Sequence, residues 1–101
     1  MALTEREVKG KLAELQQIAD SRAGYPGPAL AARVEEILAF LRALPQEDLL
    51  MSVDRLSQAF DSIFGTALYG PPEKGDWQAI VHRECARILV RLRTDPNGNV
   101  I

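Results

Sequence analysis

His82 and Cys85 are the only histidine and cysteine in the chain, and they lie three positions apart. On a helix this spacing brings two side chains close enough to share a metal ion or to act as a base and a nucleophile. A zinc site needs three or four protein ligands, and no carboxylates are spaced to complete the set. Cys85 also falls within an apolar stripe, where burial raises the pKa of a thiol and makes it unreactive. We therefore expect no metal site, no cofactor and no catalytic residues, and we do not expect an enzyme.

The same segment carries three arginines at successive intervals of four residues: Arg83, Arg87 and Arg91. A helix places them in one row, and the planar guanidinium group suits carboxylates and phosphates. The row is therefore a candidate surface for an acidic partner protein or for a nucleic acid. The alternative is a solvated face, with the arginines paired to Glu84 on the same helix or to Glu35 or Glu36 on another.

The overall charge bears on the choice between these partners. The chain has a formal net charge of −2, whereas domains that bind nucleic acids are usually basic because their affinity depends largely on phosphate neutralisation. The arginine row also has no aromatic residues interleaved with it. Nucleic-acid binding is thus the second hypothesis for this row, and a protein partner is the first.

The elements that must position these groups are helices. Apolar residues recur three and four positions apart in four segments, which predicts helices at about 4–22, 28–44, 46–68 and 76–93. Thr4 and Glu7 fit a capping box at the first helix start, and Pro28 suits the first turn of the second. Asp76 is a good N-cap for the last helix.

The pattern as a whole predicts an all-α protein. No segment alternates with a period of two residues, and the connections are short, so we expect a single-domain four-helix bundle over residues 1–94. An up-down-up-down order is the simplest arrangement, and a different crossing pattern is the alternative. The polar residues after 94 predict a loose C-terminal tail at 95–101.

Composition suggests where such a protein works. One cysteine permits no intrachain disulfide, and no run of about 18 apolar residues occurs, so we expect neither an oxidising compartment nor a membrane span. Arginine outnumbers lysine, and alanine and leucine are abundant, as is typical of GC-rich bacterial genomes. We therefore expect a cytoplasmic, bacterial protein.

The helices expected at 28–44 and 76–93 carry a second row of small residues, roughly opposite their core stripes. The rows consist of Ala32, Ala39 and Ala43 on one helix and of Ala79, Ala86 and Val90 on the other. Small side chains in a row allow another helix to approach closely, and a second copy of the chain would supply one. The alternative is that they are ordinary surface residues, since alanine is an excellent exposed helix former.

Aromatic residues accompany the two proline-rich corners of the chain. Tyr25 and Tyr69 fall within these corners, where an amphipathic ring is suited either to anchoring a partner or to closing the end of the bundle. Trp77 is in phase with the core stripe of the last helix, and we expect it to be buried.

These patterns favour a non-enzymatic protein–protein interaction module, a small adaptor or regulatory subunit that forms a homodimer. The alternative function is a nucleic-acid-associated accessory protein that uses the basic face of the last helix. The candidate partner-binding residues are the two small-residue rows, the three arginines and the two corner tyrosines.

Overall fold

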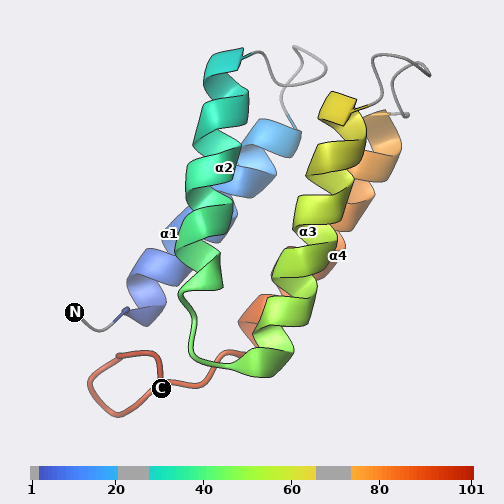
Figure 1. Ribbon diagram of the computed structural model, residues 1–101. Helices are drawn as coiled ribbons and strands as arrows, with labels where there is room; N and C mark the ends of the chain where they lie inside the picture. Colours follow the sequence, from blue (N-terminus) through green and yellow to red (C-terminus); the bar gives the residue numbers. More distant parts are fainter. Residues whose placement is uncertain (1–2, 21–27, 66–73) are drawn as a thin grey trace.

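The computed structural model describes residues 3–20, 28–65 and 74–101 and shows an all-α protein. Its helices are α1 (Glu5–Ala19), α2 (Pro28–Arg42), α3 (Glu47–Gly65) and α4 (Lys74–Arg91). In Figure 1 the chain rises along α1, descends along α2, rises along α3 and descends along α4. None of these helices, within the residues described, is long and apolar enough to cross a lipid bilayer.

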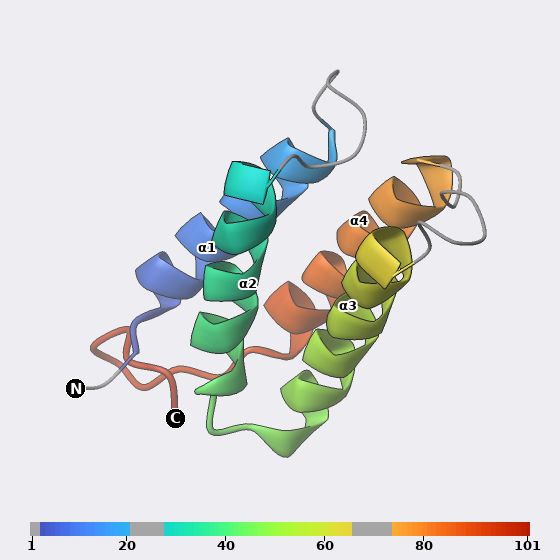
Figure 2. The same ribbon diagram turned by 45° about the horizontal axis from the view of Figure 1, so that its top comes forward.

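Each helix packs against two others. α1 contacts α2 and α4, and α3 contacts the same two helices, so α2 and α4 occupy opposite corners of the bundle. Figure 2 shows the same arrangement with the top tilted forward, with α1 and α2 on one side and α3 and α4 on the other. In the described residues α2 and α4 do not touch, which matters for every site that draws on both.

The apolar stripes of the four helices converge in one core. Its fully buried members include Leu12, Leu15, Ile37, Leu41, Leu49, Leu56, Val81 and Ile88. Trp77 is only 2% exposed, and its ring centroid lies 6.3 Å from that of Phe60 on α3. The interpretation of Trp77 as a core residue is thus confirmed.

The helix starts follow local capping chemistry in part. The hydroxyl of Thr4 accepts a hydrogen bond from the backbone amide of Glu7 at 3.2 Å, and Thr4 is the N-cap of α1 as predicted. α2 begins at Pro28, where the absent amide hydrogen is not needed. α4 begins at Lys74, so the prediction of Asp76 as its N-cap is wrong. Asp76 instead falls within the helix, two residues after its start.

The helix ends come earlier than the periodicity suggests. α2 ends at Arg42 because the next two amides donate to carbonyls three residues back instead of four. Ala43 donates to the Phe40 carbonyl and Leu44 to the Leu41 carbonyl, each at 3.1 Å. The proline at position 45 disfavours helical geometry in the residue before it. The expected helix ends near residues 22 and 68 lie outside the described residues.

The C-terminal residues are folded, and the expectation of a loose tail over 95–101 is wrong. The carboxylate of Asp95 accepts hydrogen bonds from the amides of Asn97 and Asn99, both at 2.9 Å, in an Asx-type turn. Gly98 has a φ of 85°, a conformation that favours glycine. The turn returns the chain to the N-terminus, where the amide of Val100 donates to the Leu3 carbonyl at 2.7 Å.

Gln46, between α2 and α3, fastens the end of α4 to the bundle. Its side chain is buried, its Nε2 donates to the Arg91 carbonyl at 3.2 Å, and its Oε1 accepts from the Arg93 amide at 3.0 Å. One side-chain amide thus satisfies two backbone groups at the point where the helical hydrogen bonds of α4 run out.

We expect Gln46→Ala to lower the free energy of unfolding by about 1–3 kcal/mol, because it leaves these two backbone groups without their partner. Urea denaturation followed by circular dichroism measures the change. The control is Gln17→Ala on the exposed face of α1, expected to stay within about 0.5 kcal/mol of wild type. Equal stability of the two variants would contradict the role of Gln46.

Candidate functional site

Three arginines surround one buried carboxylate between α3 and α4. The side chain of Glu84 is fully buried, and it accepts hydrogen bonds from Arg55 of α3 at 3.2 Å and from Arg87 at 3.0 and 3.2 Å. Arg83 also donates to Glu84, from Nε at 3.3 Å. We call Arg55, Arg83 and Arg87 the arginine cluster.

The position of Glu84 in the helix explains why it is buried. It lies three residues after Val81 and four before Ile88, so it takes a core position of α4 despite its charge. A buried carboxylate is costly unless it is paired and hydrogen-bonded. Burial opposes the ionisation of Glu84, but the hydrogen bond from Arg55 and the charge of Arg87 outweigh it and hold its pKa below the ordinary value.

The cluster retains excess positive charge at the surface. Three guanidinium groups face one carboxylate, and their side chains are between 43% and 55% exposed. Each guanidinium has five N–H donors, more than Glu84 accepts, so further donors face solvent. Because Glu84 already holds these long side chains, an incoming anion meets donors with little freedom left to lose.

A shallow hollow lies beside the cluster on the outer side of α3 and α4. Arg55, Gln58 and Arg83 line it with donors, and Ala59 and Ile80 line it with apolar surface. Its volume of about 290 Å³ gives room for a carboxylate-bearing side chain. Of these five residues the sequence analysis singled out only Arg83, because the others come together through the packing of two helices.

The arginine row divides into two parts in the structure. Arg83 and Arg87 belong to the cluster around Glu84, whereas Arg91 is exposed beyond it, near the end of α4. The suggested pairing with α2 is wrong for Glu36, which bonds Arg33 at 2.8 Å. The physical reason is the placement of α2 and α4 at opposite corners of the bundle.

The two rows of small residues lie on the surface. All six members are exposed: Ala32, Ala39, Ala43, Ala79, Ala86 and Val90. Val90 stands out because 85% of its surface is exposed, which is unusual for a large apolar side chain. Because the rows belong to opposite corners, the structure does not bring them together. Tyr25 and Tyr69 lie outside the described residues.

His82 and Cys85 are directed to different surroundings. The two ring nitrogens of His82 lie 3.0 Å from Oε1 of Gln16 on α1 and 2.8 Å from Oδ1 of Asp20, the C-cap of α1. Cys85 is fully buried, and burial together with the charge of Glu84 raises the pKa of its thiol to about 12. In the described residues no group of three or more potential ligands could hold a metal ion.

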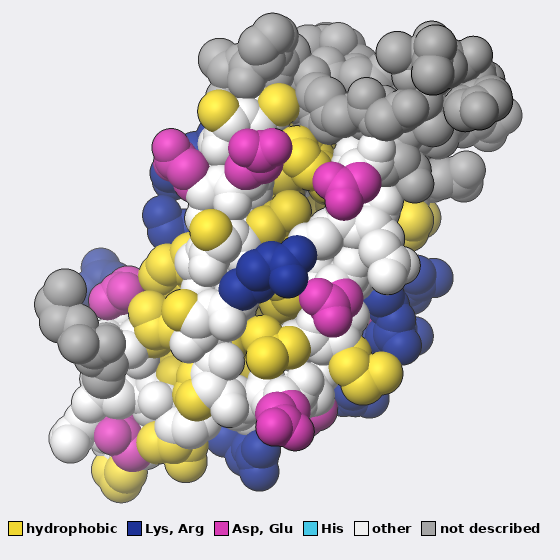
Figure 3. Space-filling view, in the orientation of Figure 1, with side chains coloured by type: hydrophobic (Ala, Val, Ile, Leu, Met, Phe, Trp, Pro, Cys, Tyr) yellow, Lys and Arg dark blue, Asp and Glu magenta, His cyan; other side chains and the backbone are white. Residues whose placement is uncertain are grey.

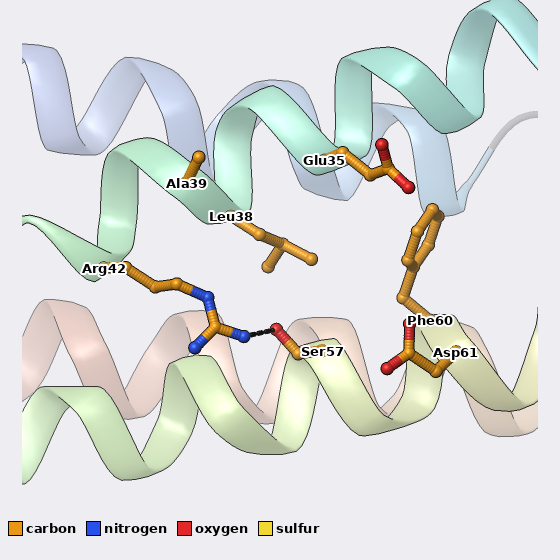
Figure 4. A pocket seen from close by; sticks show the side chains of 7 residues that line it. All are labelled: Glu35, Leu38, Ala39, Arg42, Ser57, Phe60 and Asp61. Atoms are coloured by element: carbon orange, nitrogen blue, oxygen red, sulfur yellow. Dashed lines mark hydrogen bonds between the residues drawn. The ribbon is translucent and has the colours of Figure 1, made fainter.

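A second hollow lies between α2 and α3, on the face shown in Figures 3 and 4. Its apolar surface comes from Leu38, Ala39 and Phe60, and Glu35 and Asp61 carry carboxylates at its rim. Except for Ala39, the sequence analysis did not connect these residues with a surface. The available signal was the presence of acidic residues beside the apolar stripes of α2 and α3. The distance between the two helices, which creates the hollow, cannot be predicted from the stripe of either helix alone.

No protein-family model, characterised protein or solved structure matches the chain. The function must therefore be argued from the geometry of these surfaces.

The arginine cluster makes stability depend on acidity. Because the pKa of Glu84 is lowered in the folded protein, its contribution is present above the ordinary value of 4.5 and is lost as the pH falls through the lower folded value. We expect Glu84→Gln to lower stability at pH 7 by about 1–3 kcal/mol and to flatten the decline between about pH 5 and 3. Thermal melts from about pH 7 to pH 3 measure both effects.

The control for this experiment is Glu7→Gln, on the exposed face of α1. It should leave both the stability at neutral pH and the acid decline close to wild type. An acid decline that stays unchanged in Glu84→Gln would show that the buried ion cluster does not govern it.

Proposed function

We propose that the chain is a non-enzymatic protein-interaction module, a small adaptor or regulatory subunit that binds an acidic segment of a partner protein. The binding surface consists of the arginine cluster and the exposed residues Ala86 and Val90 of α4. We call this whole surface the arginine face. The observation that carries the proposal is the buried Glu84, which holds three half-exposed guanidinium groups in fixed positions.

Energetics favour this surface over a simple solvated face. Ordering a long side chain on binding costs about 0.5–1.5 kcal/mol, and contacts with Glu84 have already met part of that cost for each arginine. Val90 adds apolar area, since fully burying such a side chain contributes roughly 1.5 kcal/mol or more. A partner that covers Val90 with an apolar residue and meets the guanidinium groups with carboxylates uses both contributions.

A protein partner fits the surface better than a nucleic acid does. The chain is acidic overall, and the most exposed large apolar residue described, Val90, lies on the arginine face, where a phosphate backbone gains nothing from it. The second candidate is a nucleic acid contacted by Arg83, Arg87 and Arg91, which their regular spacing along α4 favours. The single, buried cysteine suits a reducing compartment such as the bacterial cytoplasm, where we place the protein.

A synthetic amphipathic helical peptide with rows of glutamate and leucine tests the proposal. Fluorescence anisotropy should show binding that weakens with added salt and that falls at least about tenfold in Arg87→Gln, since a charge-assisted hydrogen bond contributes about 1.5–3 kcal/mol. Arg6→Gln, an exposed change of the same kind on α1, should bind like wild type.

Two comparison ligands complete the experiment. Binding of the same peptide with lysine in place of glutamate should not depend on Arg87, and a duplex DNA oligonucleotide should bind more weakly than the acidic peptide. Tighter binding of DNA, lost in Arg87→Gln, would replace the proposal with the nucleic-acid alternative. Circular dichroism confirms that each variant is folded.

A further inference from the structure

The hollow between α2 and α3 has the form of a small binding groove. It has a volume of about 210 Å³, with Leu38 and Ala39 on the α2 side and Phe60 on the α3 side. Figure 3 shows apolar atoms exposed between the two helices, with acidic groups on both sides of them. Leu38 and Phe60 are only 5% and 4% exposed, so the apolar floor of the groove is small, and an occupant would be held mainly by the charged groups at its rim.

The rim of this groove is negative. In the described part of the chain neither Glu35 nor Asp61 forms an ion pair, and Figure 4 shows their carboxylates at the same end of the groove, on either side of Phe60. Arg42 is the one positive residue among the described residues that line the groove, and it is already bonded to Ser57 and, at 3.3 Å, to Asp54. An occupant should therefore carry positive charge beside an apolar residue.

The arginine face of α4 has these properties. Val90 extends into solvent with 85% of its surface exposed, and Ala86 precedes it by one helical turn with a side chain small enough to allow close approach. Arg83 and Arg87 flank these two residues and carry the surplus positive charge of the cluster. The groove and the arginine face are thus opposite in charge and complementary in apolar character.

We infer that the groove between α2 and α3 binds the arginine face of a second copy of this chain. Arg83 and Arg87 of one copy approach Glu35 and Asp61 of the other, and Val90 lies beside Ala39, over the small apolar floor of the groove. This inference rests on the proposed function, because it names a second copy as an acidic partner of the arginine face.

The placement of the two surfaces determines the kind of assembly. The groove lies between α2 and α3, whereas Val90, Arg83 and Arg87 of the arginine face lie on α4. The contact joins two different surfaces, so we expect a head-to-tail association rather than the homodimer expected from the sequence. Each added copy leaves one groove and one arginine face available, so the assembly grows with concentration until it closes into a ring.

Complementing variants test this arrangement. Val90→Glu removes the arginine face as a partner, and Ala39→Glu blocks the groove; both positions are exposed, so the fold should survive. In sedimentation velocity, wild type should exceed the mass of a dimer as concentration rises, whereas each variant alone should stay monomeric. An equimolar mixture of the two variants should form a one-to-one dimer and stop there, because one intact groove meets one intact face.

Ala32→Glu is the matched control, since it makes the same change on α2 in a residue that does not line the groove. It should assemble like wild type. The inference is overturned by a wild type that stays monomeric at all concentrations, by a mixture that does not form the dimer, or by equal disruption from Ala32→Glu, which would indicate association through the alanine row instead.

The acidic peptide separates failure of this inference from failure of the proposed function. A wild type that binds the peptide but never self-associates retains the interaction function and loses only the second copy as partner. Ala39→Glu should bind the peptide as wild type does, because its arginine face is intact, and Val90→Glu should bind it more weakly. A monomeric wild type whose groove binds the lysine peptide would assign the groove to a different, basic partner and overturn the inference.

Discussion

The ionised carboxylate of Glu84 inside the contact between α3 and α4 constrains much of the rest of the structure. An unpaired charge there would destabilise the fold, so guanidinium groups must reach it from both helices. That requirement fixes the register of Arg55 against α4, leaves positive charge on one side of the bundle and helps to suppress ionisation of the adjacent Cys85. One buried acid thus links packing, surface charge and thiol chemistry.

The helices and their core were accessible from the sequence because both follow from periodicity. The apolar stripes, the N-cap Thr4 and the burial of Trp77 depend on spacing along one helix, which a sequence shows directly. The folded C-terminus was not accessible, because the Asp95 turn is stabilised by a pairing of Val100 with Leu3, at the far end of the chain. Gln46 escaped notice for the same reason, since its partners are backbone groups more than forty residues away.

The candidate surfaces show the same division. The row of Arg83 and Arg87 was visible as a spacing of four, but their meeting with Arg55 depends on which face α3 turns toward α4. The pairing of Arg87 with Glu84 was predicted and is confirmed, but the burial of Glu84 was missed, although an acid at a core position of a helix predicts several partners. The groove gave almost none, since it arises from the distance between α2 and α3 rather than from the pattern of either.

The position of Cys85 allows thiol labelling to report when α4 separates from the core. Its thiol is fully enclosed, its pKa is raised, and the chain has no other cysteine with which to confuse it. A thiol reagent in solution can therefore reach it only when α4 separates from the core. The rate of labelling measures how often that separation occurs, and it would slow if a neighbouring copy held α4 in place.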